Sequence, residues 1–384
     1  IKVNSIKGVG ASAAAITVNN SDGTCTANIT NNLSNRNLII NGAMQVAQRG
    51  TSSTDNGYGT VDRFQVSYGG TDESPTQAQV DVASGTTPYT SGFRKAFRIT
   101  NGNQTSGAGA SDFAIMLYRV EAQDLANSGW NYTSSSSYIT LSYWVKSSVA
   151  QNFFVTLKSG DGTPQKYATE TGSLSADTWT KVTKTISGNS NISFDNDNGE
   201  GLEIEWSIFR GTGQTGSMSL NAWAANNNSV RTPDQTSTWY TTNDATLEIT
   251  GVQLEVGSVA TDFEHRSYAE ELTLCHRYFY RHITGHPQLI NDGFYYLSNY
   301  LMSFVTFPVQ MRAIPTLSAT TGTDYYGFLR NGGLDNFNSF SLHSYTGTRV
   351  ACLYNNSEIS GTVGQSGMVR TGNSAALVDF IAEL

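Results

Sequence analysis

Residues 139–146 read ITLSYWVK, and this octapeptide alternates between two kinds of side chain along its whole length. One face of the extended chain carries Ile139, Leu141, Tyr143 and Val145. The other face carries Thr140, Ser142, Trp144 and Lys146. Two further stretches, LEIEWSI at 202–208 and VQLEV at 252–256, alternate in the same way. A period of two residues is typical of a strand with one face in the core, so all three stretches are predicted to be strands of that kind.

Many more strands are predicted around these three. Strand-like stretches occur at 94–100, 113–120, 153–158, 178–186 and 246–249. The chain has 37 Gly against 7 Pro, and the connections are rich in Asn, Ser and Thr, as expected for strands joined by polar turns. Residues 38–264 are therefore predicted to form an all-β domain, an antiparallel double-sheet sandwich of jelly-roll type.

The first 37 residues are expected to form an N-terminal β arm. Residues 15–18 and 24–30 are strand-like, and the NNSDG sequence between them is a turn signal. Because two strands alone are not a stable domain, the arm should pair with another chain, with the next domain or with the structure that carries the protein. Its apolar stretch is short and interrupted, so we expect no export by a secretory signal.

One connecting helix is predicted over residues 265–282. Its apolar stripe has helical spacing and consists of Tyr268, Leu272, Cys275 and Phe279. Ser267 and Glu270 have the spacing of a capping box at its start. Arg277 and Arg281 would then lie at its negative end, where the helix dipole favours cations.

A second β domain is predicted beyond the helix, at residues 283–384. Strand and turn signals alternate there as far as the final ALVDFIAEL. Pro308 and Pro315 are expected at strand ends or on a sheet edge, because proline cannot donate a hydrogen bond to the ladder.

Composition excludes several partners. The net charge is -8, so the chain has no basic stripe for nucleic acid, and no apolar run is long enough to insert into a membrane. Cys25, Cys275 and Cys352 are odd in number and far apart, which argues against a disulfide framework or a metal cluster. We expect reduced thiols, most of them buried, and no cofactor.

Several of these stretches together resemble a known family. They are NLIINGAMQVAQRGTSST (37–54), GYGTVDRF (57–64), SYWVKSS (142–148), LEITGVQLEVGSVATDFEHRSYAEELTLCHRYF (247–279) and VTFPVQMRAIPTLS (305–318). The chain is similar here to tail-fibre proteins of tailed bacteriophages, notably those that infect marine cyanobacteria. The most specific part is the GVQLEVGSVATDFEHRSYAEEL block. The central sandwich is also similar to carbohydrate-binding modules of jelly-roll form.

The resemblance implies a virion protein of the phage tail, usually a homotrimer. Such a protein is assembled in the host cytoplasm and acts outside the host cell. Its N-terminal part would contact other tail proteins, and its C-terminal part would contact the host, through a cell-surface glycan or lipopolysaccharide. A fibre segment or capsid decoration protein without receptor binding is the structural alternative, because a fold of this kind does not itself prove sugar binding.

A glycan site needs an aromatic platform beside amide or hydroxyl groups, so loop aromatics are the candidates in the sandwich. They are Trp130, Tyr132, Trp223, Trp239 and Tyr240. The alternative for each ring is that it seals an end of the sandwich.

In the second β domain, TDYYGFLRNGGLDNFNSF (323–340) is the main candidate for receptor contact. Of its five aromatic residues, Tyr325, Tyr326 and Phe337 are the candidate contacts, beside Phe328 and Phe340. Ordinary packing in the core or in an interface is the alternative for these rings.

Three polar groups have both a structural and a functional interpretation. Asp62 and Arg63 are expected to form a local structural pair, with receptor contact as the alternative. The sequence FDNDNGEG suggests a weak calcium site with the candidate ligands Asp195, Asp197 and Glu200, but it departs from an EF-hand loop, and a solvated turn is the favoured interpretation. His276, His282 and His286 lie near Cys275 in sequence. A zinc site would need the three histidines and Cys275 to converge on one point. Helical geometry points Cys275 and His276 in different directions, so we expect solvated or interface histidines instead.

No catalytic motif is present in the sequence. A glycan-cleaving tailspike would need a carboxylate pair flanking the glycosidic bond, and none of the carboxylates lies in a motif that separates the two roles. We therefore expect a protein that is not an enzyme.

Overall fold

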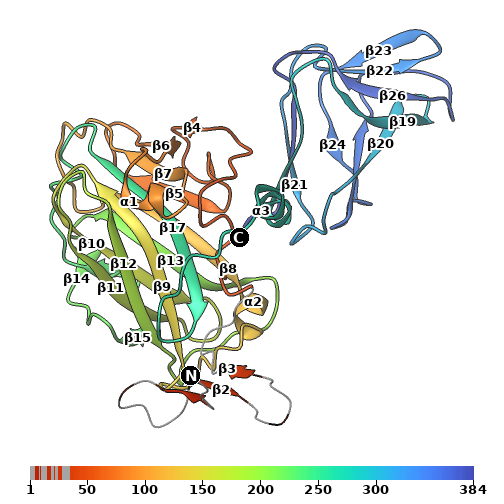
Figure 1. Ribbon diagram of the computed structural model, residues 1–384. Helices are drawn as coiled ribbons and strands as arrows, with labels where there is room; N and C mark the ends of the chain where they lie inside the picture. The colour runs from red at the N-terminus through yellow and green to blue at the C-terminus, as the bar shows by residue number, and fades with distance from the viewer. Residues whose placement is uncertain (1–4, 8, 10–14, 19–20, 22–24, 28–34) are drawn as a thin grey trace.

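The chain folds into antiparallel β-sheets, and the computed structural model describes residues 5–7, 9, 15–18, 21, 25–27 and 35–384. Two six-stranded sheets face each other as a sandwich in the larger part of the molecule (Figure 1). A seven-stranded and a three-stranded sheet form a C-terminal unit, and helix α3 (Tyr268–Cys275) lies between the two parts. The predicted all-β class is confirmed. No helix within the described residues is long and apolar enough to cross a membrane.

The first sheet of the sandwich has the order β15-β11-β10-β13-β8-β5, and the second has the order β12-β9-β17-β7-β6-β4. The strands of the first sheet are β5 (Phe64–Gly69), β8 (Phe113–Glu121), β10 (Asn152–Ser159), β11 (Gln165–Ser173), β13 (Glu200–Arg210) and β15 (Trp223–Ala225). The strands of the second sheet are β4 (Ser52–Ser53), β6 (Thr76–Asp81), β7 (Lys95–Thr100), β9 (Tyr138–Ser147), β12 (Thr180–Ser187) and β17 (Thr246–Val256). Their connections contain α1 (Thr87–Thr90), α2 (Ala122–Ala126) and the parallel pair of β14 (Thr215–Gly216) and β16 (Thr232–Pro233).

The core between the two sheets consists of the side chains that the alternating patterns predicted to face inward. Ile139, Leu141, Tyr143 and Val145 are all buried in β9, and so are the apolar residues of 202–208 in β13. Tyr143 and Trp206 meet across the core with ring centroids 5.8 Å apart at 87°. Such edge-to-face pairs add to the stability that burial of the ring area provides.

The opposite face of β17 departs from the simple pattern. Gln253 and Glu255 alternate with apolar residues, yet both are completely buried. The chain segment at 261–265 lies over them and accepts or donates hydrogen bonds to their side chains. A period of two residues assigns a side chain to a face but does not reveal what covers that face.

The described part of the N-terminal arm forms a three-stranded antiparallel sheet of β1 (Ser5–Ile6), β2 (Ile16–Val18) and β3 (Cys25–Ala27). β2 and β3 lie within the two predicted strand-like stretches and pair antiparallel. The rest of the predicted 24–30 strand lies outside the described residues.

Helix α3 begins as predicted and ends earlier. Ser267 accepts a hydrogen bond from the backbone N–H of Glu270, whose side chain accepts one from the N–H of Ser267, so the capping box is present. The helix ends at Cys275, and Phe279 starts strand β18 (Phe279–Thr284). The prediction that the helix runs to 282 is wrong because residue 279 onward pairs with the C-terminal strand, and this tertiary pairing overrides helical propensity.

The C-terminal unit has its own apolar core. Its small sheet has the order β18-β27-β21, with β21 (Thr316–Ala319) and β27 (Leu377–Ile381). Its large sheet has the order β23-β22-β26-β19-β20-β25-β24, with β19 (Leu289–Leu297), β20 (Tyr300–Thr306), β22 (Tyr326–Arg330), β23 (Gly333–Phe337), β24 (Ser341–Leu342), β25 (Val350–Asn355) and β26 (Ser366–Thr371). Pro308 follows β20 and Pro315 precedes β21, so both lie outside the strands, as predicted.

Asp62 and Arg63 do not pair with each other, which corrects the prediction of a local pair. Arg63 is buried, donates to the Glu383 carboxylate at 2.6 Å and places its guanidinium 3.5 Å from the centre of the Tyr278 ring. Asp62 accepts a hydrogen bond from the backbone N–H of Gln48. Adjacent residues on a backbone point their side chains in different directions, and here Arg63 also has a positive φ of 74°.

These contacts belong to a polar contact region between the sandwich and the C-terminal unit, which we call the joint. Arg277 pairs with the buried Glu121 at 2.7 Å, and Arg281 pairs with Asp379 at 2.8 Å while donating to the Gln48 carbonyl. Hydrogen bonding to Arg277 and Tyr278 lowers the pKa of Glu121, although burial opposes this effect. Both parts of the molecule therefore supply charges to one partly buried network.

Candidate functional site

Most of the rings proposed as glycan platforms are core residues. Those that are buried are Trp130, Trp239, Tyr240, Tyr326 and Phe337. Tyr240 stacks on Phe209 at 4.2 Å, and Tyr326 lies 5.7 Å from Phe337. A ring with no exposed face cannot stack on a sugar, so these five candidates are corrected to packing roles. Aromatic side chains bury large apolar areas, which explains their position even where the surrounding sequence is polar.

The other three candidates are half-buried. Tyr132 packs edge-on against Phe194, and Tyr325 lies beside the core of the C-terminal unit. Trp223 lies at the sheet edge, where its indole N–H donates to the Ser187 carbonyl at 2.7 Å and its ring is 5.3 Å from Tyr167. It borders an open hollow of about 460 Å³ that is otherwise lined by Thr163, Gln165, Asn191, Ala224 and Ala225.

The weak calcium candidates do not converge. Glu200 faces Arg119 and Lys158, and Asp197 accepts a hydrogen bond from the Gly199 N–H within its own turn. Within the part of the chain that the structure describes, no three His, Cys, Asp or Glu side chains are placed to hold a metal ion.

The histidines are separated as well. The His282 ring lies 2.8 Å from the Ile290 carbonyl, and the His286 ring lies 2.8 Å from the Thr371 carbonyl. His276 packs edge-on against Tyr280. Burial raises the pKa of the Cys275 thiol and lowers the pKa of His276.

A pocket lies on the outer face of the second sheet of the sandwich. We call it the sheet-face pocket, and its volume is about 520 Å³. Its lining consists of Thr90, Ser91, Gly92, Phe93, Ser142, Trp144, Lys181, Gly251, Thr261, Asp262, Phe263 and His265. Pockets of this size hold small organic ligands, most often with apolar walls and a few placed polar groups.

The floor of the pocket is the outer face of three neighbouring strands. Trp144 of β9 is opposite Lys181 of β12 on one side and Thr250 of β17 on the other. The register of β17 shifts between Thr250 and Gln253, and Gly251 adopts a positive φ of 63° within this shift. A Cβ at Gly251 would lie 2.6 Å from the Phe93 ring, so only glycine lets that ring pack against the strand.

One wall of the pocket is the segment Thr261–His265, which we call the strap. Its attachment explains why β17 carries buried polar residues. Glu255 accepts hydrogen bonds from the backbone N–H and the hydroxyl of Thr261, at 2.8 and 2.6 Å. Gln253 accepts one from the Glu264 N–H at 2.8 Å. Buried polar groups need such partners, and satisfying them fixes the position of the strap.

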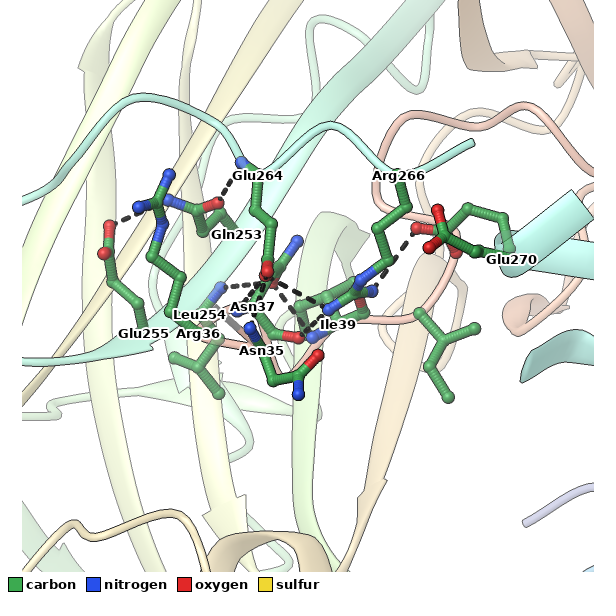
Figure 2. Close-up of polar contacts among 12 residues, drawn as sticks. Asn35, Arg36, Asn37, Ile39, Gln253, Leu254, Glu255, Glu264, Arg266 and Glu270 are labelled. Carbon is green, nitrogen blue, oxygen red and sulfur yellow. Dashed lines mark hydrogen bonds and ion pairs between the residues drawn. The ribbon is translucent and has the colours of Figure 1, made fainter. Parts of the chain in front are cut away.

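A second set of contacts holds the end of the strap, and Figure 2 shows Glu264 at its centre. The Glu264 carboxylate accepts from the N–H groups of Asn35 and Asn37 at 2.7 and 2.8 Å. The Asn37 side chain donates to the Val252 carbonyl and accepts from the Leu254 N–H, which ties it to β17. Arg266 donates to the Asn37 carbonyl at 2.6 Å (Figure 2). The strap is therefore anchored on both its sides.

Aromatic rings form the apolar part of the pocket. Phe93 and Phe263 meet edge-on with centroids 4.8 Å apart, and the His265 ring lies 5.1 Å from Phe93 and 4.9 Å from Phe263. Trp144 is half-buried and packs against the same small cluster. The pocket thus offers a half-buried indole beside a wall of three rings.

Polar groups that can still form hydrogen bonds or ion pairs lie next to these rings. His265 Nε2 lies 3.0 Å from the Ser91 carbonyl and must donate to it, which leaves Nδ1 as an acceptor. Lys181 and Asp262 are both exposed, and neither has an ion-pair partner among the described residues. Donors and acceptors beside exposed ring area suit a ligand with many hydroxyl groups.

Sequence reasoning placed Trp144 on the outer face of its strand but did not identify the pocket. The lining comes from five stretches between residues 90 and 265, and nothing in the local sequence of any one of them predicts that they meet. The sequence GVQLEVGSVATDFEH contains one local indication of the pocket. Its polar Gln and Glu alternate with apolar residues directly before a Gly-Ser turn.

No protein-family model and no curated protein matches the chain. Among solved structures, the enzymatically active domain of bacteriophage CBA120 tailspike protein 4 is similar at 12% identity over 58% of this chain, with a TM-score of 0.31. This chain covers only 21% of that structure's length. The N-terminal cellulose-binding domain of Cellulomonas fimi β-1,4-glucanase C matches 56% of this chain and 99% of its own at 12% identity, with a TM-score of 0.27. The CBM22-1 xylan-binding domain of Paenibacillus barcinonensis Xyn10C matches 58% and 96% at 11% identity, with a TM-score of 0.26. Structural neighbours thus include a phage tailspike and carbohydrate-binding modules, and likeness at this level does not bear on function.

Proposed function

We propose that this chain is a tail-fibre protein of a bacteriophage virion that binds a glycan of the host surface in the sheet-face pocket. The observation that carries the proposal is the half-buried Trp144 beside the Phe93, Phe263 and His265 rings, with unpaired polar groups at the same place. Sugars have flat apolar ring faces and hydroxyl edges, and this combination matches both.

Each part of the pocket has a role in such binding. The Trp144 indole stacks on one face of a sugar ring, and the aromatic wall excludes water from its edge. Asp262 and His265 Nδ1 accept hydrogen bonds from sugar hydroxyls, whereas Lys181 donates them. Because the strap and the strand are held by buried hydrogen bonds, the pocket needs little rearrangement to bind, which lowers the entropic cost of association.

The phage setting rests on the sequence resemblance to tail-fibre proteins. In this proposal the N-terminal arm attaches to other tail proteins, the chain assembles as a homotrimer in the host cytoplasm, and the C-terminal unit extends toward the host. Light scattering on the purified protein is expected to give the mass of a trimer. A monomer at micromolar concentration would contradict the trimer but would leave the proposal of a glycan site unaffected.

Binding without cleavage is part of the proposal. Hydrolysis of a glycosidic bond needs two carboxyl groups on either side of the bond. Asp262 is the single carboxylate among the described residues that line the pocket. Purified protein is therefore expected to release no reducing sugar from host envelope polysaccharide, and such release would contradict this part.

The test of the pocket is binding of purified full-length protein to a glycan array and to host cells. The Trp144→Ala variant should bind at least about tenfold more weakly, a loss of ~1.4 kcal/mol, with an unchanged circular dichroism spectrum. Trp223→Ala is the matched control, because that ring is also half-buried but borders the hollow on the other sheet. If the Trp144→Ala variant binds glycan as tightly as the wild type does, the proposed site is overturned. Failure of the wild type to bind any glycan or to block infection would favour a structural fibre segment or decoration protein.

A further inference from the structure

The C-terminal unit carries a second group of rings on its surface. Four tyrosines and one histidine form a continuous cluster: Tyr296, Tyr300, His343, Tyr345 and Tyr354. Tyr300 stacks on Tyr354 with centroids 5.1 Å apart and planes 10° apart. His343 lies 5.8 Å from Tyr354 and 4.4 Å from Tyr345. We call this cluster the tyrosine platform.

The platform lies on the face of the large sheet that points away from the apolar core. Met302 pairs with Tyr354 and Leu301 pairs with Asn355, so Tyr300 and Tyr354 share one face of β20 and β25. Leu301 and Leu353 are on the opposite face and are completely buried in the core. The platform rings are therefore not part of that core, although Met302 and Cys352 on the same face as the rings are buried.

The position of the platform leaves it accessible. β20 runs from Tyr300 toward Arg312, whose side chain donates to the Asn198 carbonyl of the sandwich, so the Tyr300 end of the strand points away from the joint. Figure 1 shows the large sheet projecting beyond α3 on the side away from the sandwich. Tyr345 is 76% exposed and Tyr296 is 59% exposed.

The hydroxyl groups of the platform are also available. Within the described residues, none of its four phenol groups takes part in a hydrogen bond, whereas the buried Tyr295 and Tyr326 hydroxyls both do. None of the five platform residues bears a formal charge at neutral pH when the histidine is unprotonated. Tyrosine supplies a large, rigid, amphipathic contact surface at a low entropic cost.

From this geometry we infer that the tyrosine platform is a second glycan-binding site, which takes consecutive rings of an uncharged polysaccharide. A row of partly exposed rings with free hydroxyl groups matches the alternating ring faces and hydroxyl edges of such a chain. The absence of formal charge gives an anionic polymer no electrostatic advantage there. This site goes beyond the sheet-face pocket and does not depend on it.

The test is affinity electrophoresis of the full-length protein in gels that contain soluble xyloglucan, glucomannan or dextran, with alginate as an acidic polysaccharide. Wild-type protein is expected to be retarded by at least one neutral polysaccharide. The Tyr300→Ala/Tyr345→Ala variant should lose about tenfold in apparent affinity for it. Tyr138→Ala is the matched control, because it removes a partly exposed tyrosine from the sandwich.

Trp144→Ala, tested in the same gels, separates this inference from the proposed function. Retardation that survives Trp144→Ala but not the double tyrosine variant supports the platform alone. Retardation that survives the double tyrosine variant overturns the platform, as does the lack of retardation by any neutral polysaccharide or retardation by alginate only. If light scattering shows that the double tyrosine substitution dissociates an oligomer, the platform is a contact between copies of the chain. That result would also overturn the proposed glycan site.

Discussion

At the scale of single residues, burial changes the pKa of Asp62. This side chain is 1% exposed within the joint, and burial raises its pKa from the ordinary value of 3.8 to about 6, against the attraction of Arg49 and the hydrogen bonds from Gln48. Between these two values the folded state holds a proton that the unfolded state does not. The contribution of Asp62 to the free energy of unfolding therefore rises as the pH falls through about 6 and levels off below the unfolded value.

We expect this contribution to reach about 3 kcal/mol across that window, and Asp62→Asn should abolish it. The measurement is urea denaturation of wild type and variant from pH 7.5 to pH 3.5, compared as a difference so that other carboxylates cancel. Asp55→Asn, which makes the same substitution at an exposed position, is the control for the substitution itself. A constant difference between wild type and Asp62→Asn over the range would contradict the raised pKa.

Residue type alone did not decide which aromatics are exposed. Trp239 and Trp223 both occur in stretches rich in Asn, Ser and Thr, yet one is completely buried and the other borders an open hollow. The difference arises from the sheet edge on which β15 lies and from the packing of Trp239 into the core, and both depend on strand order. Strand order is set by contacts between distant residues, which a single sequence does not display.

At the element scale, the register shift of β17 determines how the aromatic wall of the sheet-face pocket packs against the strand. It turns Gly251 under the Phe93 ring, so Gly251→Ala places a methyl group against that ring in a backbone conformation that favours glycine. We expect a loss of about 1–3 kcal/mol in the free energy of unfolding and weaker glycan binding, because the aromatic wall must move.

Denaturation and binding measurements on Gly251→Ala check this expectation. Gly85→Ala is the control, since Gly85 also has a positive φ but nothing lies within 4 Å of its added methyl group. The control should show only the backbone cost and should bind as the wild type does. Equal effects of the two variants would mean that the contact with Phe93 is unimportant.

Elements with a strong local signal were predictable. The alternating stretches at 139–146 and 202–208 are strands with the expected core faces, and the capping box marks the true start of α3. The end of that helix was not predictable, because the pairing of Phe279 with Ile381 joins residues about a hundred positions apart. The burial of Gln253 and Glu255 has a different cause, because their strap partners are only 6 and 11 positions away. The alternating pattern does not show that the chain folds back over this face of the strand.

At the scale of the whole molecule, the end of the chain returns to the sandwich. Glu383 bridges Arg49 and Arg63 at 3.1 and 2.6 Å, and all three side chains are at least nine-tenths buried. Removing one partner of a buried ion pair leaves an uncompensated charge, which costs about 3–5 kcal/mol. Glu383→Ala should therefore loosen the joint without changing either apolar core.

Calorimetry tests this prediction. We expect Glu383→Ala to lower the melting temperature of the C-terminal unit and to broaden or split the unfolding transition. Asp81→Ala is the control, because it removes an exposed ion pair with Lys95 that should contribute at most about 1 kcal/mol. Indistinguishable thermograms for the two variants would show that the Glu383 carboxylate does not couple the two parts.

The joint has a consequence for avidity. The joint fixes the sandwich and the C-terminal unit relative to each other. A long polymer captured at one of the two proposed binding surfaces would therefore meet the other at a high effective concentration, whereas a short oligosaccharide would engage only one. Affinity should then grow steeply once the polymer is long enough to span both, and a loosened joint should flatten that dependence on length.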